Sequence, residues 1–192
     1  NLYGVDIMEE AVEICKLRLF LKLVAQIEPD PNADNLGIEP LPDIDFNIRA
    51  GNTLVGYATA DDVRKVFKEK PVGKQAQTKL QFGEVLSEYE RFEERVELAD
   101  RAFKQFRRMQ TDPDLDPNDF AHAKQTLRTR LKLLNDELNR HLAGEYGISV
   151  AKKAEYANWL KSHQPFHWFV EFYGIMKDGG FDVIIGNPPY VE

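Results

Sequence analysis

Two apolar heptad patterns run through the middle of the chain, and together they require two long helices that pack against each other. In the first pattern, apolar residues between positions 84 and 109 follow one another at alternating steps of four and three: Val85, Tyr89, Phe92, Val96, Ala99, Phe103 and Phe106. The second pattern follows a turn at 111–118, rich in proline and aspartate, and contains Phe120, Leu127, Leu131, Leu134 and Leu138. The sequence therefore predicts an antiparallel helical hairpin over residues 84–143.

The region before the hairpin alternates between strand and helix patterns. Residues 2–5 are typical of a short buried strand that ends at Asp6, and a second short strand over 46–50 is closed by Gly51 and Asn52. Between the strands, residues 8–27 have a helical apolar period, formed by Ala11, Val12, Cys15, Leu19, Leu23 and Ile27. A strand–helix–strand unit of this kind is half of a doubly wound nucleotide-binding fold.

After the hairpin the pattern returns to helix and then strand. Residues 165–175 are rich in aromatic side chains and predict a helix, which the pair Gly179-Gly180 ends. Residues 181–186 have a continuous β-branched centre, which predicts a buried strand with the loop 187–190 at its carboxyl end. Ligands of open α/β sheets bind beyond the carboxyl ends of the strands, so we expect the chemistry of the protein in this loop.

Composition excludes several classes of protein. A chain of 192 residues can form one domain with a large insertion, and its net charge of −7 argues mildly against a general nucleic-acid binder. The segment 63–82 has six basic residues and one acidic residue, and we favour a solvated loop there over a phosphate contact. The single cysteine, Cys15, excludes an internal disulfide and suits a reducing cytoplasm. No apolar run is long enough to cross a bilayer, so we expect no membrane partner.

The loop Asn187-Pro188-Pro189-Tyr190 has the groups needed to activate an amine on an aromatic ring. Such an amine is a poor nucleophile because its lone pair is delocalised into the ring. The side-chain oxygen of Asn187 and the carbonyl of Pro188 can accept both N–H hydrogens, which frees the lone pair for attack. The two prolines hold these acceptors rigidly, and Tyr190 offers a face on which a flipped base can stack. The alternative interpretation is an ordinary proline turn.

The strand and loop 181–190 resemble the catalytic motif of amino-methyltransferases that act on adenine N6. The longer run from Pro165 to Tyr190 is similar to type IIG restriction-modification enzymes and to large BREX-type adenine methyltransferases, and Asn47–Leu54 is similar to the end of their third strand. The resemblance implies an α/β fold, a partial Rossmann-like class I methyltransferase sheet with a long inserted helical hairpin. Residues 1–58 and 163–192 would belong to the methyltransferase domain, and residues 59–162 to the helical insertion.

The resemblance also assigns roles in binding S-adenosyl-L-methionine. Asp6, at the end of the first strand, would bind the ribose hydroxyls, and Ile7 would pack on the adenine ring. Asn52 stands where many relatives have an aspartate that contacts the adenine amino group. Each residue has a structural alternative: Asp6 and Glu9 fit a helix capping box, and Asn52 fits a turn residue after Gly51.

Three residues have the spacing of metal ligands on one helical face. His163, His167 and Glu171 follow one another at intervals of four. Pro165 interrupts this spacing and the neighbours are bulky aromatics, so we favour packed or capping histidines and expect no metal site.

The chain opens on Asn1 and stops directly after its strongest motif, so we expect it to be part of a longer parent protein. The glycine-rich cofactor loop of the family would precede Asn1, and we expect the isolated chain to be inactive. The parent would methylate double-stranded DNA in a restriction-modification or other phage-defence system. The alternatives are methylation of a protein glutamine or an rRNA guanine, or a purely structural segment. Without the first strand of the family, the strands ending at Asp6 and Gly186 would have unpaired edges. We expect these strands to pair directly, to be joined by the remainder of the parent chain or a second copy, or to shift from the parent arrangement.

Overall fold

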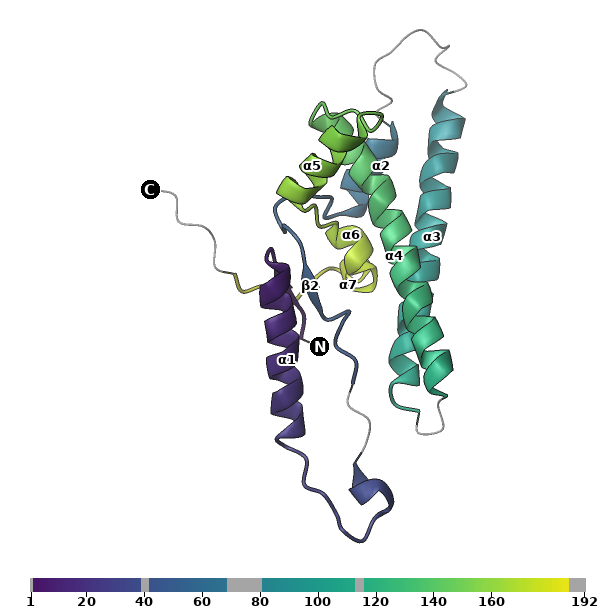
Figure 1. Cartoon of the computed structure of the whole chain (residues 1–192). Coiled ribbons are helices and arrows are strands. Elements are labelled where there is room, and N and C mark those ends of the chain that lie inside the picture. The colour runs from purple at the N-terminus through teal and green to yellow at the C-terminus, as the bar shows by residue number, and fades with distance from the viewer. Residues whose placement is uncertain (1, 39–41, 69–80, 113–115, 187–192) are drawn as a thin grey trace.

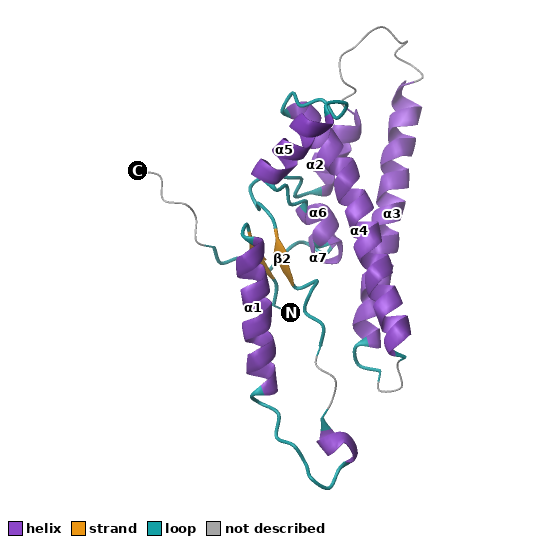
Figure 2. Ribbon diagram, in the orientation of Figure 1, coloured by secondary structure: helices purple, strands orange, loops and turns teal. Residues whose placement is uncertain are grey.

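The computed structural model describes residues 2–38, 42–68, 81–112 and 116–186 (Figure 1). Strand β1 (Gly4–Asp6) leads into helix α1 (Glu9–Val24), and a loop with a short 3-10 helix, η1 (Asp34–Gly37), leads to strand β2 (Ile48–Ala50). The strands are parallel, with Gly4 opposite Ile48 and Asp6 opposite Ala50. This unit is the predicted strand–helix–strand, and α1 lies beside the strand pair in Figure 2.

The two heptad patterns form two long helices, α3 (Gln81–Met109) and α4 (Pro117–Glu145), that lie side by side (Figure 1). Helix α4 begins with a proline at its first position, and the carboxylate of Asp116 accepts a hydrogen bond of 2.7 Å from the amide of Asn118. Most of the predicted heptad positions that the structure describes are buried: Tyr89, Phe92, Val96, Ala99, Phe106, Leu127, Leu134 and Leu138. Burial of one such large apolar side chain contributes about 1.5–3 kcal/mol.

Four shorter helices pack on the hairpin and join it to the sheet. Their bounds are α2 (Ala60–Lys68), α5 (Lys153–His163), α6 (Trp168–Glu171) and α7 (Tyr173–Lys177). Apolar side chains from all four share one core with the hairpin, and a second cluster of Phe46, Phe106 and Leu127 joins the segment before β2 to the far half of the hairpin. None of the described helices has the length and apolar character of a membrane span.

The prediction of a buried strand over 181–186 is wrong. This segment has no strand conformation, and the side chains of Val183, Ile184 and Ile185 are 73%, 72% and 92% exposed. Phe181 packs on the rings of Tyr3 and Phe172, and the chain then leaves the sheet. A buried parallel strand needs a hydrogen-bonded neighbour and cover on both faces. The described residues provide neither here, and the sheet that they form has two strands, β1 and β2.

Two further elements differ from the sequence prediction. The aromatic stretch 165–175 forms two short helices, because the backbone of Phe172 leaves the helical conformation (φ −128°, ψ 37°). Helix α1 places its predicted apolar positions inward, with Val12 fully buried, but its opposite face is apolar too. The exposed residues of that face are Ile14, Leu17, Phe20, Leu21 and Val24. Helix α1 also contains charged residues, and an exposed apolar stripe of this kind is typical of a face that another part of a protein covers.

Candidate functional site

The parallel register brings three of the candidate residues to one edge of the sheet. Asp6 lies opposite Ala50, and the amide of Gly51 donates a hydrogen bond of 2.9 Å to the carbonyl of Asp6. Ile7 is therefore the first residue beyond the carboxyl end of β1, and Asn52 is the second residue beyond the carboxyl end of β2. This edge is where an open α/β sheet binds its ligands.

Asp6 combines a local bond with an exposed carboxylate. Its Oδ1 accepts a hydrogen bond of 2.8 Å from the amide of Met8, which satisfies a backbone donor at the start of α1. Asp6 makes no ion pair within the part of the chain that the structure describes. The neighbouring side chain of Ile7 is 48% exposed. An acid that can accept from hydroxyls therefore stands next to an open apolar surface.

Asn52 is a turn residue in this structure. Its side-chain oxygen accepts a hydrogen bond of 3.1 Å from the amide of Leu54, and its own amide donates one of 2.7 Å to the carbonyl of Gln164. The oxygen that would accept from an adenine amino group is thus already bonded within its own loop. Asn52 would have to rotate, or to use its second lone pair, to make that contact.

The loop after β2 lies tightly against the segment before α6. A Cβ atom on Gly51 would come within 2.7 Å of the ring of Phe166, and one on Gly56 within 2.2 Å of the carbonyl oxygen of Phe166. Both glycines have positive φ angles, of 155° and 143°. Only glycine fits at these two positions, against the ring of Phe166 at Gly51 and against its backbone at Gly56.

The catalytic candidates Asn187, Pro188, Pro189 and Tyr190 lie outside the described residues. The structure thus brings together Asp6, Ile7 and Asn52, and it does not place residues 187–190.

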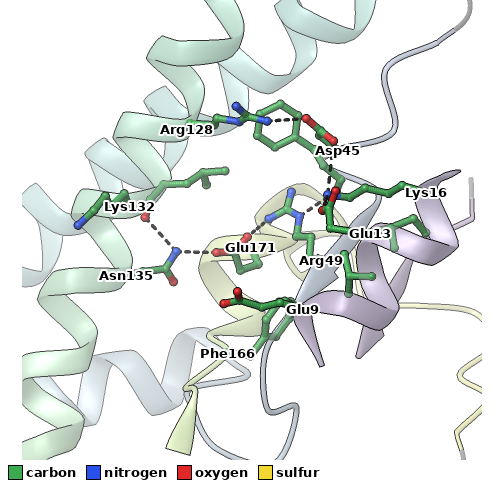
Figure 3. Close-up of a pocket in the computed structure, with 15 residues that line it drawn as sticks. Glu9, Glu13, Lys16, Asp45, Arg49, Arg128, Lys132, Asn135, Phe166 and Glu171 are labelled. Atoms are coloured by element: carbon green, nitrogen blue, oxygen red, sulfur yellow. Dashed lines mark hydrogen bonds and ion pairs between the residues drawn. The ribbon is translucent and has the colours of Figure 1, made fainter. Parts of the chain in front are cut away.

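A groove of about 480 Å³ lies between α1 and β2 on one side and α4 on the other (Figure 3). Its cations are Lys16, Arg49, Arg128 and Lys132. Each is paired with an acid: Lys16 with Glu13 and Asp45, Arg49 with Glu171, Arg128 with Asp45 and Lys132 with Asp136. With each of these cations paired, the groove is a polar contact region between the sheet and the hairpin.

Asp45 is the centre of an ion network that links α1 to α4. Its carboxylate lies 3.4 Å from Lys16, 2.6 Å from Lys124 and 2.5 Å from Arg128, and Lys124 also pairs with Asp43. Burial opposes the charge of Asp45, but the hydrogen bond from Lys124 and the three positive charges hold its pKa below the ordinary value. The loop before β2 is thereby tied to both helices.

This network predicts a specific loss of stability in acid. Because the folded-state pKa of Asp45 is lowered, its stabilising contribution is complete above the unfolded pKa of about 3.9 and disappears as the pH falls below it. The melting temperature of Asp45→Asn should therefore fall less than that of the wild type as the pH is lowered below about 4. Thermal unfolding across a pH series measures this, with Glu10→Gln, an exposed change on α1, as the control. Identical acid profiles for Asp45→Asn and wild type would contradict it.

The spacing of His163, His167 and Glu171 has a structural explanation. The ring of His163 stacks on Trp159 at 5.4 Å, and His167 is fully buried between the loop after β2 and α4. Glu171 forms an ion pair with Arg49. The three side chains have separate partners, and no group of three potential metal ligands occurs within the described ranges.

Comparison with known proteins decides the family. The family model described as Eco57I restriction-modification methylase matches residues 1–192, the whole chain. The chain belongs to this family of restriction-modification methylases. The helical hairpin is therefore a part of the Eco57I methylase region, and along the sequence it follows the two strands and precedes Asn187-Pro188-Pro189-Tyr190.

One curated relative agrees with the family assignment. A protein of Methanocaldococcus jannaschii, RM.MjaORFECS2P, provisionally named a type II restriction enzyme and methyltransferase, is 32% identical over 229 aligned residues. The alignment covers 99% of this chain and 18% of the relative, so the chain spans less than a fifth of the relative's length. No solved structure matches the Eco57I methylase chain.

Two polar contacts of this methylase region were absent from the sequence prediction, which described His167 only as a packed or capping histidine. The buried pair Arg49–Glu171 joins β2 to α6, and the buried His167 joins the loop after β2 to α4. The partners lie far apart in the sequence, so no local period reveals them. Arg49, within the strand pattern 46–50, was the one sequence feature that could have indicated such a pair, because a charge in a buried strand requires a partner.

Proposed function

We propose that the full-length protein transfers a methyl group from S-adenosyl-L-methionine to the N6 amine of adenine in duplex DNA. The observation that carries this proposal is the sequence Asn187-Pro188-Pro189-Tyr190 in a member of a restriction-modification methylase family. A methylase that serves a restriction system has DNA as its natural substrate. Acceptors for two N–H hydrogens beside an aromatic ring suit an exocyclic amine on a base.

The residues at the sheet edge fit part of a nucleoside cofactor. The second oxygen of the Asp6 carboxylate has no hydrogen-bond partner among the described residues and is available to ribose hydroxyls. The exposed side chain of Ile7 offers apolar cover to an adenine ring. Asn52 would contribute chiefly by fixing the loop, because its side-chain oxygen is engaged with the amide of Leu54. When bound, S-adenosyl-L-methionine supplies an electrophilic methyl group.

The remaining work falls on the loop 187–190. Asn187 and the carbonyl of Pro188 accept the two hydrogens of the target amine and direct its lone pair toward the methyl group. Tyr190 stacks on the base after it has left the duplex. No general base is needed before attack, since the amine proton becomes acidic only after the methyl group is transferred.

The partners of this region are duplex DNA and the rest of the full-length protein. The apolar outer face of α1 and the exposed run Val183-Ile184-Ile185 together leave a large apolar surface open. Soluble domains rarely leave such surfaces uncovered. The rest of the protein, more than four fifths of the length in the M. jannaschii relative, contains ample chain to cover this surface.

The substrate is tested by tritiated methyl transfer from S-adenosyl-L-methionine with the full-length protein. Unmethylated DNA and a glutamine-containing protein are offered separately, and the labelled product is hydrolysed and identified. We expect label in DNA alone, recovered as N6-methyladenine. Label in protein alone would assign the enzyme to glutamine methylation, and label in another base would refute the adenine specificity.

A further inference from the structure

We infer that the helical hairpin contributes to cofactor binding by the methyltransferase. Helix α4 positions the loop 51–57, which contains Asn52, through Asn139 and His167, and we call this set of contacts the clamp. This inference rests on the proposed function, since it concerns the loop that we assign to cofactor binding. The contacts that carry it connect three segments that are distant in the sequence: residues 51–57, residues 164–169 and the end of α4.

His167 is the central link of this clamp. Its side chain is fully buried, and its ring stacks on Tyr57 at 5.2 Å with an angle of 13° between the planes. Nδ1 accepts a hydrogen bond of 3.1 Å from the amide of Tyr57, so the ring proton is on Nε2. Nε2 donates that proton to the side-chain oxygen of Asn139 at 3.0 Å. Burial lowers the pKa of His167 to about 3, which keeps this neutral arrangement fixed.

Backbone hydrogen bonds hold the same loop along its length. Asn52 donates to the carbonyl of Gln164 at 2.7 Å, Phe166 donates to Val55 at 2.7 Å, and Phe169 donates to Tyr57 at 3.2 Å. Gly56 has no room for a side chain against the carbonyl of Phe166. The loop and the segment before α6 are therefore held together along their length.

The hairpin fixes this unit at a second point. The hydroxyl of Tyr57 donates a hydrogen bond of 2.6 Å to Glu145, the last residue of α4. Glu145 thus holds the hydroxyl of Tyr57, and Asn139, on the same helix, holds its backbone through His167. The loop is thus attached to Asp6 at one end, through the amide of Gly51, and to α4 at the other end, through Tyr57. The end of α4 therefore determines how the loop is positioned relative to Asp6. Asn139 and His167 are positioning residues: they act on the cofactor through the loop.

The test compares three variants of the full-length protein. Asn139→Ala removes the acceptor of His167, Asn139→Asp keeps an acceptor, and Val96→Ala creates a similar defect in the hairpin core away from the clamp, where Val96 is 1% exposed. For each we would measure the S-adenosyl-L-methionine Kd by calorimetry, KM and kcat for transfer to DNA, the melting temperature, and hydrogen exchange at the Tyr57 amide.

We expect Asn139→Ala to raise the cofactor Kd and KM about tenfold, with a much smaller change in kcat, and to speed exchange at Tyr57. Asn139→Asp should keep the cofactor Kd and KM near those of the wild type. Val96→Ala should lower the melting temperature and leave the cofactor Kd and KM unchanged. Unchanged cofactor Kd in Asn139→Ala, or an equal rise in Val96→Ala, would overturn the clamp. A wild-type protein that binds cofactor but transfers no methyl group to DNA would instead overturn the proposed function, and the Kd and exchange comparison would still test the clamp.

Discussion

Glu171→Ala is expected to destabilise the chain by about 3–5 kcal/mol, because it leaves the charge of Arg49 buried without a partner. The guanidinium of Arg49 lies against the ring of Phe172 at 4.9 Å, pairs with Glu171, and donates from Nε to the carbonyl of Phe46 at 2.8 Å. Burial lowers the pKa of Arg49 to about 9, so it still carries its charge at neutral pH. For a chain of this length the loss corresponds to a fall in melting temperature of roughly 6–20 °C.

Thermal unfolding followed by circular dichroism measures this loss, and two variants show its origin. The double change Arg49→Met with Glu171→Leu should recover most of the stability, because an apolar pair of similar volume avoids the cost of burying charge. Glu97→Ala, which breaks an exposed pair with Lys177, should have a far smaller effect. A double variant as unstable as Glu171→Ala would show that lost packing, and not the unpaired charge, causes the defect.

The sequence predicts the hairpin well because its signal is local and periodic. The buried apolar residues of α3 and α4 recur at heptad spacing, so one misplaced residue does not alter the conclusion. The strand–helix–strand unit is similarly readable, and the inward face of α1 agrees with its period. From that unit alone, Asp6 and Asn52 could be expected at one edge of the sheet.

Prediction fails where a segment depends on partners that the sequence pattern does not name. Residues 181–186 have the composition of a buried strand, but a strand requires a neighbouring strand, and none pairs with it among the described residues. The apolar outer face of α1 was not predicted for the same reason, because the sequence does not show which part of the protein would cover it. Arg49 and His167 depend on contacts across more than a hundred residues, to Glu171 and Tyr57 respectively.

Asn187→Ala is expected to lower kcat for DNA methylation by the full-length protein about 100- to 1,000-fold, the range seen when one oriented transition-state partner is removed. Asn187 would contact the target amine and not the cofactor, so binding of S-adenosyl-L-methionine should be unchanged. The loss belongs in kcat because the acceptor acts most strongly when the amine nitrogen becomes pyramidal in the transition state. Single-turnover transfer of a tritiated methyl group measures the chemical step directly.

Two companion variants separate the acceptor role from the shape of the loop. Asn187→Asp keeps a side-chain oxygen at the same position and should retain far more activity than Asn187→Ala. Tyr190→Ala should weaken the binding of the flipped base, by about 1–3 kcal/mol of lost stacking, while Asn187 remains able to accept from the amine. If Asn187→Ala and Asn187→Asp were equally impaired, the loop conformation would be the deciding factor, and the proposed hydrogen bond to the amine would have to be abandoned.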